Sequence, residues 1–217
     1  MTTRVRTIED PATPLVLRER DGVTELLSGR VVLLSSAALE TEHAFGRLVA
    51  ARLDSLARPV RVLIGGLGFG ATVRGLLEGV RPDASVLVVE KVAAVERLLR
   101  GELAELAREV LADARVRVAT GDVGEVIADA RDLDAILLDV DNGPHWASFR
   151  GNARLYTPAG LGAALRALRP AGVFAVWSGY PADAFLARMR EAGFNSAVAP
   201  LHEGGRVRAR AYLGVRP

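Results

Sequence analysis

The chain has 217 residues, of which 50% are hydrophobic, so one main domain with a sizeable core and a small appendage can form. It contains no cysteine, which excludes a disulfide framework, a thiolate metal site and catalysis by a thiol. The net charge is only +2, arginines and acids are interspersed, and 5% of residues are aromatic, so we expect no nucleic-acid partner.

The first 39 residues predict a small antiparallel β-sheet. Residues 1–13 are polar and are expected to lack regular structure, whereas residues 14–36 contain short apolar runs separated by Asp21-Gly22 and Ser28-Gly29. These dipeptides are typical of turns between paired strands. The N-terminus lacks the apolar core of a signal peptide, and no apolar run reaches the length of a membrane span. We therefore expect a cytoplasmic protein without a membrane partner.

The rest of the chain, residues 40–217, predicts an α/β domain. An amphipathic helix is expected over about residues 40–57, and Pro59 ends it. From Val60 onward, apolar strand-like runs alternate with helical patterns, which indicates a parallel sheet covered on both faces. One helical stretch is expected up to about Ala112. The last two segments, on either side of Glu203-Gly204-Gly205, predict a C-terminal antiparallel hairpin.

A glycine-rich turn follows the first strand of this domain. The strand is expected to end at Ile64 and the next helix to begin near Ala71. Four glycines lie between them: Gly65, Gly66, Gly68 and Gly70. Glycine lets the backbone turn sharply and approach a ligand closely, and the helix N-terminus beyond it offers free N–H groups. We therefore predict a nucleotide-like ligand at this turn, with an ordinary tight turn as the alternative.

Acidic residues follow the next three predicted strands. Glu90 is placed to accept both hydroxyls of a ribose, Gly121-Asp122 lies where an adenine amino group would bind, and Asp139 ends the third strand. This arrangement is typical of enzymes that bind S-adenosylmethionine, and a nicotinamide-dependent oxidoreductase is the alternative from the glycine turn alone. A solvated acid at position 90 and a helix N-cap at Asp122 are alternative interpretations, and the cap is compatible with ligand binding.

Together these motifs resemble the spermidine synthase (polyamine aminopropyltransferase) family over nearly the whole chain. The resemblance rests on IGGLGFG in the glycine turn, on Glu90, on Gly121-Asp122, on the loop DVDNGP that begins at Asp139, and on LRPAGVFAV at residues 168–176. It implies a Rossmann-like class I methyltransferase fold. Such a fold has a mostly parallel sheet with a C-terminal antiparallel hairpin, here preceded by the small N-terminal β-sheet.

The resemblance also implies an activity, namely transfer of an alkyl (aminopropyl) group from an adenosyl sulfonium donor to a small-molecule amine. The co-substrate would be S-adenosylmethionine or its decarboxylated form, without a metal, and a homodimer is a further expectation. Such a displacement needs an in-line, unprotonated amine. By resemblance, Asp139 would help to remove the proton, Asp141 would be a second amine ligand, and Tyr156 would close the pocket. A solvated turn at Asp141 and a packing tyrosine are the alternatives.

Two departures from the family pattern keep other functions open. The glycine turn has Leu67, Gly68 and Phe69 where the family has an acid associated with the amino group of the decarboxylated donor. Residues 35–48 lack the glutamine and the Tyr-His-Glu run of the family's amine-binding segment, and the nearest polar residues there are Glu40, Glu42 and His43. An S-adenosylmethionine-dependent methyltransferase acting on a small molecule is therefore an alternative, and a non-catalytic nucleoside-binding module is a second one.

Overall fold

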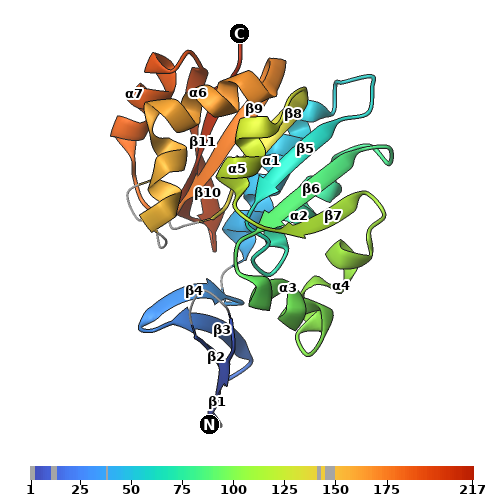
Figure 1. The fold of residues 1–217 in the computed structure, drawn as a ribbon, viewed down its shortest axis with the longest axis vertical. Coiled ribbons are helices and arrows are strands. Elements are labelled where there is room, and N and C mark those ends of the chain that lie inside the picture. The colour runs from blue at the N-terminus through green and yellow to red at the C-terminus, as the bar shows by residue number, and fades with distance from the viewer. Residues whose placement is uncertain (1–2, 11–13, 38, 141–142, 145–149) are drawn as a thin grey trace.

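The chain folds into two β-sheets, and helix α1 (Glu40–Leu53) follows the first of them (Figure 1). The computed structural model describes residues 3–10, 14–37, 39–140, 143–144 and 150–217. The predicted division between residues 1–39 and 40–217 falls at the start of α1. Of the helices in these described ranges, none is long and apolar enough to cross a membrane.

The N-terminal sheet has four antiparallel strands in sequence order, as predicted: β1 (Thr3–Ile8), β2 (Leu15–Arg20), β3 (Val23–Ser28) and β4 (Val31–Ser35). Asp21 and Gly22 have φ values of 51° and 79°, as a two-residue hairpin turn requires. The expectation that residues 1–13 lack regular structure is wrong for β1, which pairs with β2 over its whole length. Because the side chains of β1 are mostly exposed, it is held by backbone pairing that leaves no apolar pattern in the sequence.

The main sheet has seven strands in the order β10-β11-β9-β8-β5-β6-β7, and the five from β9 to β7 are parallel. The strands are β5 (Arg61–Gly65), β6 (Ser85–Glu90), β7 (Val116–Thr120), β8 (Leu133–Leu138), β9 (Leu168–Ser178), β10 (Asn195–Glu203) and β11 (Arg206–Val215). The last two form the predicted antiparallel hairpin. The chain order reverses between β5 and β8, and ligands of open α/β sheets bind at the carboxyl ends of strands at such a point.

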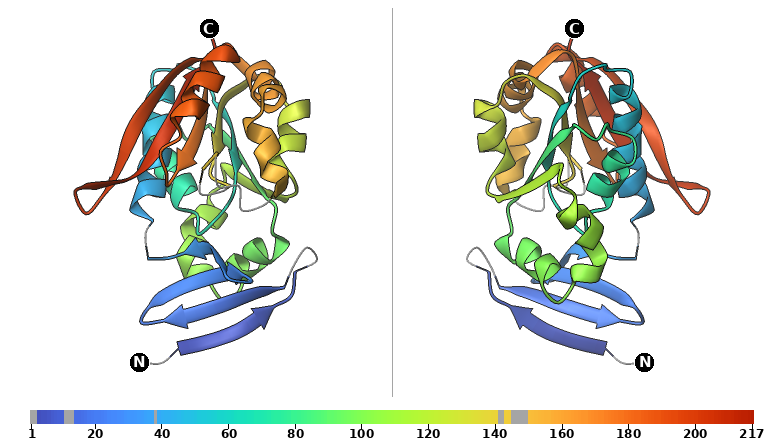
Figure 2. Two further views of the ribbon diagram at one scale, coloured as in Figure 1. Left: turned by 90° about the vertical axis from the view of Figure 1, so that its left-hand side faces the viewer. Right: turned by 90° about the vertical axis from the view of Figure 1, so that its right-hand side faces the viewer.

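Helices cover both faces of the main sheet, as predicted, and Figure 2 shows α1 and α2 across the sheet from α5 and α6. One face packs against α1, α2 (Ala71–Leu77), α3 (Ala93–Arg100) and α4 (Ala104–Ala112). The other packs against α5 (Val123–Asp129), the 3-10 helix η1 (Arg150–Tyr156), α6 (Pro158–Ala167) and α7 (Asp183–Glu191). The single helical stretch expected before Ala112 is two helices, because the backbone of Gly101 leaves the helical conformation.

The N-terminal sheet lies beside α3, at the end of the main sheet where the parallel strands finish (Figure 1). Asp10 Oδ2 accepts a hydrogen bond of 3.0 Å from the backbone N–H of Ala94, in the first turn of α3. Arg97, one turn further on, donates to the carbonyl oxygen of Glu9. This docking brings Leu33 of β4 to the same pocket that the main sheet lines.

Candidate active site

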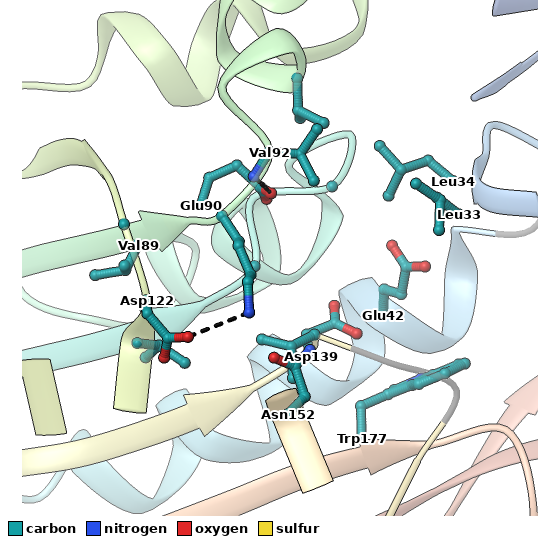
Figure 3. Close-up of a pocket in the computed structure, with 17 residues that line it drawn as sticks. Leu33, Leu34, Glu42, Val89, Glu90, Val92, Asp122, Asp139, Asn152 and Trp177 are labelled. Atoms are coloured by element: carbon teal, nitrogen blue, oxygen red, sulfur yellow. Dashed lines mark hydrogen bonds and ion pairs between the residues drawn. The ribbon is translucent and has the colours of Figure 1, made fainter. Parts of the chain in front are cut away.

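A pocket opens at the carboxyl ends of β5, β6, β7 and β8, where the strand order reverses. The free space within it, open solvent at its mouth included, is about 910 Å³. The pocket also takes wall residues from β4, α1, β9 and η1, so segments far apart in the sequence meet there (Figure 3). The charged and amide side chains in its described lining are Glu42, Glu90, Lys91, Asp122, Asp139 and Asn152.

The glycine turn after β5 forms the floor of this pocket through Gly66 and Gly68. Gly66 has a φ of 90°, and a Cβ added there would lie 2.1 Å from the carbonyl oxygen of Asp139, so only glycine allows the two strand ends to approach this closely. The predicted Gly65 and Gly70 lie outside the described lining. Gly65 packs against Val123, and Gly70 precedes α2 with a φ of 81°, so both shape the turn.

Glu90 is nearly buried, with 8% of its surface exposed, and it lines the pocket. Its Oε2 accepts a hydrogen bond from the backbone N–H of Leu67 and its Oε1 accepts one from that of Val92, each 2.8 Å long. Burial raises the pKa of Glu90, although these backbone donors act in the opposite direction. The backbone N–H groups of Lys91 and Gly68 act on this pKa in the same direction. Backbone donors thus orient the Glu90 carboxylate, which lines the pocket as a candidate acceptor for ribose hydroxyls.

Asp122 lines the pocket at the end of β7 and also caps α5, so the N-cap interpretation is confirmed. Its Oδ1 accepts a hydrogen bond of 2.8 Å from the backbone N–H of Gly124 and lies 2.5 Å from the guanidinium of Arg154. Its Oδ2 lies 3.2 Å from Lys91 Nζ. Burial acts to raise the pKa of Asp122, but the Gly124 hydrogen bond and the two cations lower it below its ordinary value.

Asp139 follows β8 and contacts α2 through Thr72. The Thr72 hydroxyl lies 2.6 Å from Asp139 Oδ2 and 3.2 Å from the backbone carbonyl oxygen of Glu42. Burial raises the pKa of Asp139 to about 6, with the Thr72 hydrogen bond acting to lower it and the charge of Glu90 to raise it. A carboxyl group with this pKa changes its protonation state close to neutral pH, which suits a general base.

Glu42, in the first turn of α1, is the functional candidate that the sequence-based site lacked. It lines the pocket, and Figure 3 shows its carboxyl group facing the same space as that of Asp139. Burial raises the pKa of Glu42 to about 9, helped by the negative charges of Asp139 and Glu203. The two carboxyl groups therefore titrate as a pair that holds about one proton at neutral pH. The only sequence signal was that Glu42 lies among the polar residues at the start of this helix.

Of the other predicted site residues in the described part of the chain, Gly121 lies in the pocket and Tyr156 lies in the core. Gly121 lines the pocket beside Asp122, whereas Asp141 lies outside the described residues. Tyr156 is 2% exposed and packs edge-to-face on Phe185, with a ring-centroid distance of 5.6 Å. It belongs to the core under α6 and α7 and not to the described pocket lining. The structure therefore corrects the expectation that Tyr156 closes the pocket. The buried position of its ring fits the alternative, a packing tyrosine.

The described lining has four acidic side chains and one lysine, and these charges are unevenly distributed. Lys91 pairs with Asp122 at one end of the pocket, whereas Glu42 and Asp139 lie together near Trp177 (Figure 3). The Trp177 indole N–H donates a hydrogen bond of 3.3 Å to Thr41 Oγ1, which fixes the ring at the pocket wall. A pocket with low-dielectric walls and an excess of one charge attracts ligands of the opposite charge, so this end suits a cationic or amine ligand.

Comparisons with known proteins identify the fold. No family model matches the chain, and neither does any curated protein. Among solved structures, spermidine synthase from Thermotoga maritima matches with a TM-score of 0.78 and 16% identity, over 99% of this chain and 73% of that one. A spermidine synthase in complex with the transition state analogue AdoDATO matches over the same shares, with a TM-score of 0.77 and 15% identity. The CurJ carbon methyltransferase matches with a TM-score of 0.57 and 13% identity, over 81% of this chain and 54% of that one.

These matches confirm the predicted fold. The chain has a spermidine synthase-like class I methyltransferase fold, with a small antiparallel sheet ahead of a mostly parallel sheet that ends in an antiparallel hairpin. Identities of 13–16% establish a fold and not an activity, because one fold can carry many functions and the pocket residues decide among them.

Proposed function

We propose that the chain is a transferase that moves an aminopropyl-type alkyl group from an adenosyl sulfonium donor to an amine acceptor. The observation that carries this proposal is the pair of carboxyl groups of Glu42 and Asp139, which face one space in the pocket beside Glu90. A likeness in fold to spermidine synthases, one of them in complex with AdoDATO, supports it.

The donor's nucleoside would lie along the ends of β6 and β7. In this arrangement Glu90 accepts the ribose hydroxyls, the backbone at Gly66 and Gly68 approaches the donor closely, and Asp122 faces the base. The sulfonium and its alkyl chain would then point toward Asp139. The acidic end of the pocket favours the positive charge of the sulfonium and of an acceptor amine by electrostatic attraction.

In the reaction, the lone pair of the amine nitrogen attacks the carbon bonded to the sulfonium sulfur. The carbon–nitrogen bond forms while the electrons of the carbon–sulfur bond return to sulfur, which leaves as a neutral thioether. Asp139 accepts the proton that the nitrogen must lose. An alkylammonium has a pKa of about 10, so transfer to a carboxylate with a pKa of about 6 costs about 5 kcal/mol. That cost fits within the barrier of about 17 kcal/mol that corresponds to one turnover per second.

Glu42 would assist by holding the pair's shared proton. With a pKa of about 9, it is neutral at neutral pH while Asp139 is mainly ionised, so the base keeps its charge without a second anion beside it. A bound ammonium near Glu42 would favour ionisation of that carboxyl group and so strengthen its hold on the acceptor.

Methyl transfer from intact S-adenosylmethionine is the second candidate, and the glycine turn favours it. Leu67 and Phe69, each 3% exposed, replace the acid that the resembling family uses for the amino group of the decarboxylated donor. Against this candidate, the carboxylate of intact S-adenosylmethionine would have to lie near Glu42 and Asp139, where the negative charge of Asp139 repels it. Aminopropyl transfer is therefore the first choice.

Product analysis separates these candidates. The protein is incubated with a panel of amines and with either decarboxylated or intact S-adenosylmethionine, and products are identified by mass spectrometry. We expect an aminopropylated amine together with 5′-methylthioadenosine. A methylated product together with S-adenosylhomocysteine would replace this proposal by the second candidate. Tight donor binding without turnover of any amine would favour the non-catalytic module.

A further inference from the structure

Lys91 is the only lysine of the chain and directly follows Glu90 at the end of β6. It lines the pocket, and its ammonium lies 3.2 Å from Asp122 Oδ2 (dashed line in Figure 3). Glu90 marks the ribose end of the proposed nucleoside site and Asp122 marks the base end. Lys91 adjoins Glu90 in the chain and its Nζ contacts Asp122, so its side chain runs from one end of the site to the other.

The other partners of Asp122 come from outside the described pocket lining. Gly124 donates from the backbone of α5, and Arg154 reaches Oδ1 from η1. Neither residue lines the pocket in the part of the chain that the structure describes. A ligand group that approaches Asp122 through the pocket therefore meets Oδ2, the oxygen that Lys91 holds.

We propose that Lys91 is a specificity-determining residue of the nucleoside site, an inference that rests on the proposed function. Its ammonium holds Asp122 Oδ2 in the free protein and competes there with the amino group at position 6 of an adenine base. A base with a carbonyl oxygen at that position accepts a hydrogen bond from the ammonium and does not compete for Asp122. Lys91 thus lowers the affinity for an adenine base relative to that for hypoxanthine, so the preference for adenine is smaller than it would be without the lysine.

The exposure of the ion pair sets the expected size of the effect. The Lys91 side chain is 39% exposed and that of Asp122 is 18% exposed. Partly exposed pairs of this kind contribute modestly, which corresponds to about a two- to five-fold change in a binding constant. A ligand can therefore displace Lys91, and the residual competition is large enough to measure.

Calorimetric titration tests the competition with 5′-methylthioadenosine and 5′-methylthioinosine, two uncharged probes that differ at position 6 of the base. We expect Lys91→Met, which keeps the apolar stem and removes the charge, to bind 5′-methylthioadenosine about two- to five-fold more tightly. The same variant should bind 5′-methylthioinosine more weakly. Lys91→Arg should stay close to the unmodified protein. Arg100→Met, which removes an exposed ion pair with Glu96 on α3, is the matched control and should change neither affinity.

Ionic strength supplies an independent readout. Added salt screens the ion pair between Lys91 and Asp122, so 5′-methylthioadenosine should bind more tightly to the unmodified protein as salt rises. This response should be lost in Lys91→Met. Because the probe is uncharged, salt does not act on a charge of the ligand.

The outcomes distinguish the failure of this inference from that of the proposed function. If 5′-methylthioadenosine binds, Glu90→Gln weakens it and Lys91→Met leaves it unchanged or weaker, the role of Lys91 is overturned and the nucleoside site stands. If neither the unmodified protein nor Lys91→Met binds either nucleoside, the proposed nucleoside site and the competition both fall. A preference for adenine that is equal in Lys91→Met and the unmodified protein also overturns the inference.

Discussion

The Thr72 hydroxyl lies 2.6 Å from Asp139 Oδ2, and this contact joins the start of α2 to the end of β8. Thr72 is 3% exposed, so the hydroxyl has little water as an alternative partner and holds the carboxyl group in one orientation. Thr72 is a positioning residue in the proposed mechanism, because it acts through Asp139.

Replacing this hydroxyl should shift the pH dependence of the reaction. The Thr72 hydrogen bond lowers the pKa of Asp139 against the effect of burial, so Thr72→Val should raise that pKa. The acid limb of the kcat profile then moves to higher pH. Thr72→Ser keeps a hydroxyl and is the control. A profile of Thr72→Val that overlays that of the unmodified protein would show that the hydroxyl does not influence the base.

Replacing the carboxyl group itself should separate chemistry from binding. Asp139→Asn keeps the size of the side chain and removes the proton acceptor, so we expect kcat to fall by about 10²- to 10⁴-fold. Binding of 5′-methylthioadenosine, which depends on Glu90 and the glycine turn, should change by less than about threefold. Single-turnover kinetics measure the loss of catalysis, and calorimetric titration measures the affinity for 5′-methylthioadenosine. Retained turnover in Asp139→Asn would transfer the role of base to another residue.

The difference between Asp139 and Glu42 illustrates what a sequence can predict about this site. The ends of parallel strands meet at one edge of a sheet, so the order of strands and acids along the chain is enough to group Glu90, Asp122 and Asp139. Glu42 comes from a helix that precedes the sheet, and its carboxyl group reaches the pocket only because α1 packs against α2 at close range. A Cβ on Gly46 of α1 would lie 2.1 Å from the backbone oxygen of Thr72. Such a helix contact has no signature in strand periodicity.

The sequence failed to predict strand β1 and the position of Tyr156 for a similar reason, because both depend on tertiary contacts. Alternating strands and helices were recognisable because apolar runs repeat with the period of each element. Strand β1 has only one buried side chain, Ile8, so its sequence carries no such period, and its pairing with β2 depends on tertiary structure. Tyr156 was assigned to the pocket by resemblance, whereas its ring packs against Phe185, a partner distant in the sequence.

The buried carboxyl group of Glu42 should make the protein less stable as pH rises. Its folded-state pKa of about 9 lies above the ordinary value of 4.5, so between these limits the folded state holds a proton that the unfolded state has lost. The free energy of unfolding then falls with rising pH, by up to about 1.4 kcal/mol per pH unit. Glu42→Gln removes this contribution, so the variant should gain stability over the unmodified protein as pH rises from about 6 to about 9.

Urea denaturation of Glu42→Gln and of the unmodified protein, from about pH 6 to about pH 9, measures this difference in stability. Asp139 and Glu90 have pKa shifts of the same sign and remain in both proteins. Because Glu42 and Asp139 titrate as a pair, the difference between the two curves reports the loss of Glu42 together with the response of Asp139 to that loss. Glu78→Gln, an exposed acid at the end of α2 that pairs with His43, is the matched control. Parallel stability curves for Glu42→Gln and the unmodified protein would mean that Glu42 is ionised in the folded state.

Two glycines of the pocket should respond to alanine in opposite ways. Gly66→Ala places a Cβ 2.1 Å from a backbone oxygen at a φ of 90°, so we expect a loss of roughly 3 kcal/mol or more in unfolding free energy. Gly121 also lines the pocket, but a Cβ there meets no atom within 4 Å among the described residues. Gly121→Ala should therefore change stability by less than about 0.5 kcal/mol, while the added methyl group enters the space assigned to the nucleoside.

The informative measurement on Gly121→Ala is its affinity for 5′-methylthioadenosine. Because the methyl group would occupy ligand volume next to Asp122, we expect the Kd to rise about tenfold or more while Tm stays unchanged. Gly205→Ala, at the exposed turn of the β10–β11 hairpin, likewise meets no described atom within 4 Å and should leave the Kd unchanged. If Gly121→Ala folds normally and binds the nucleoside as tightly as the unmodified protein, the base does not lie beside Asp122, and both the assignment of the adenine end and the competition by Lys91 would have to be abandoned.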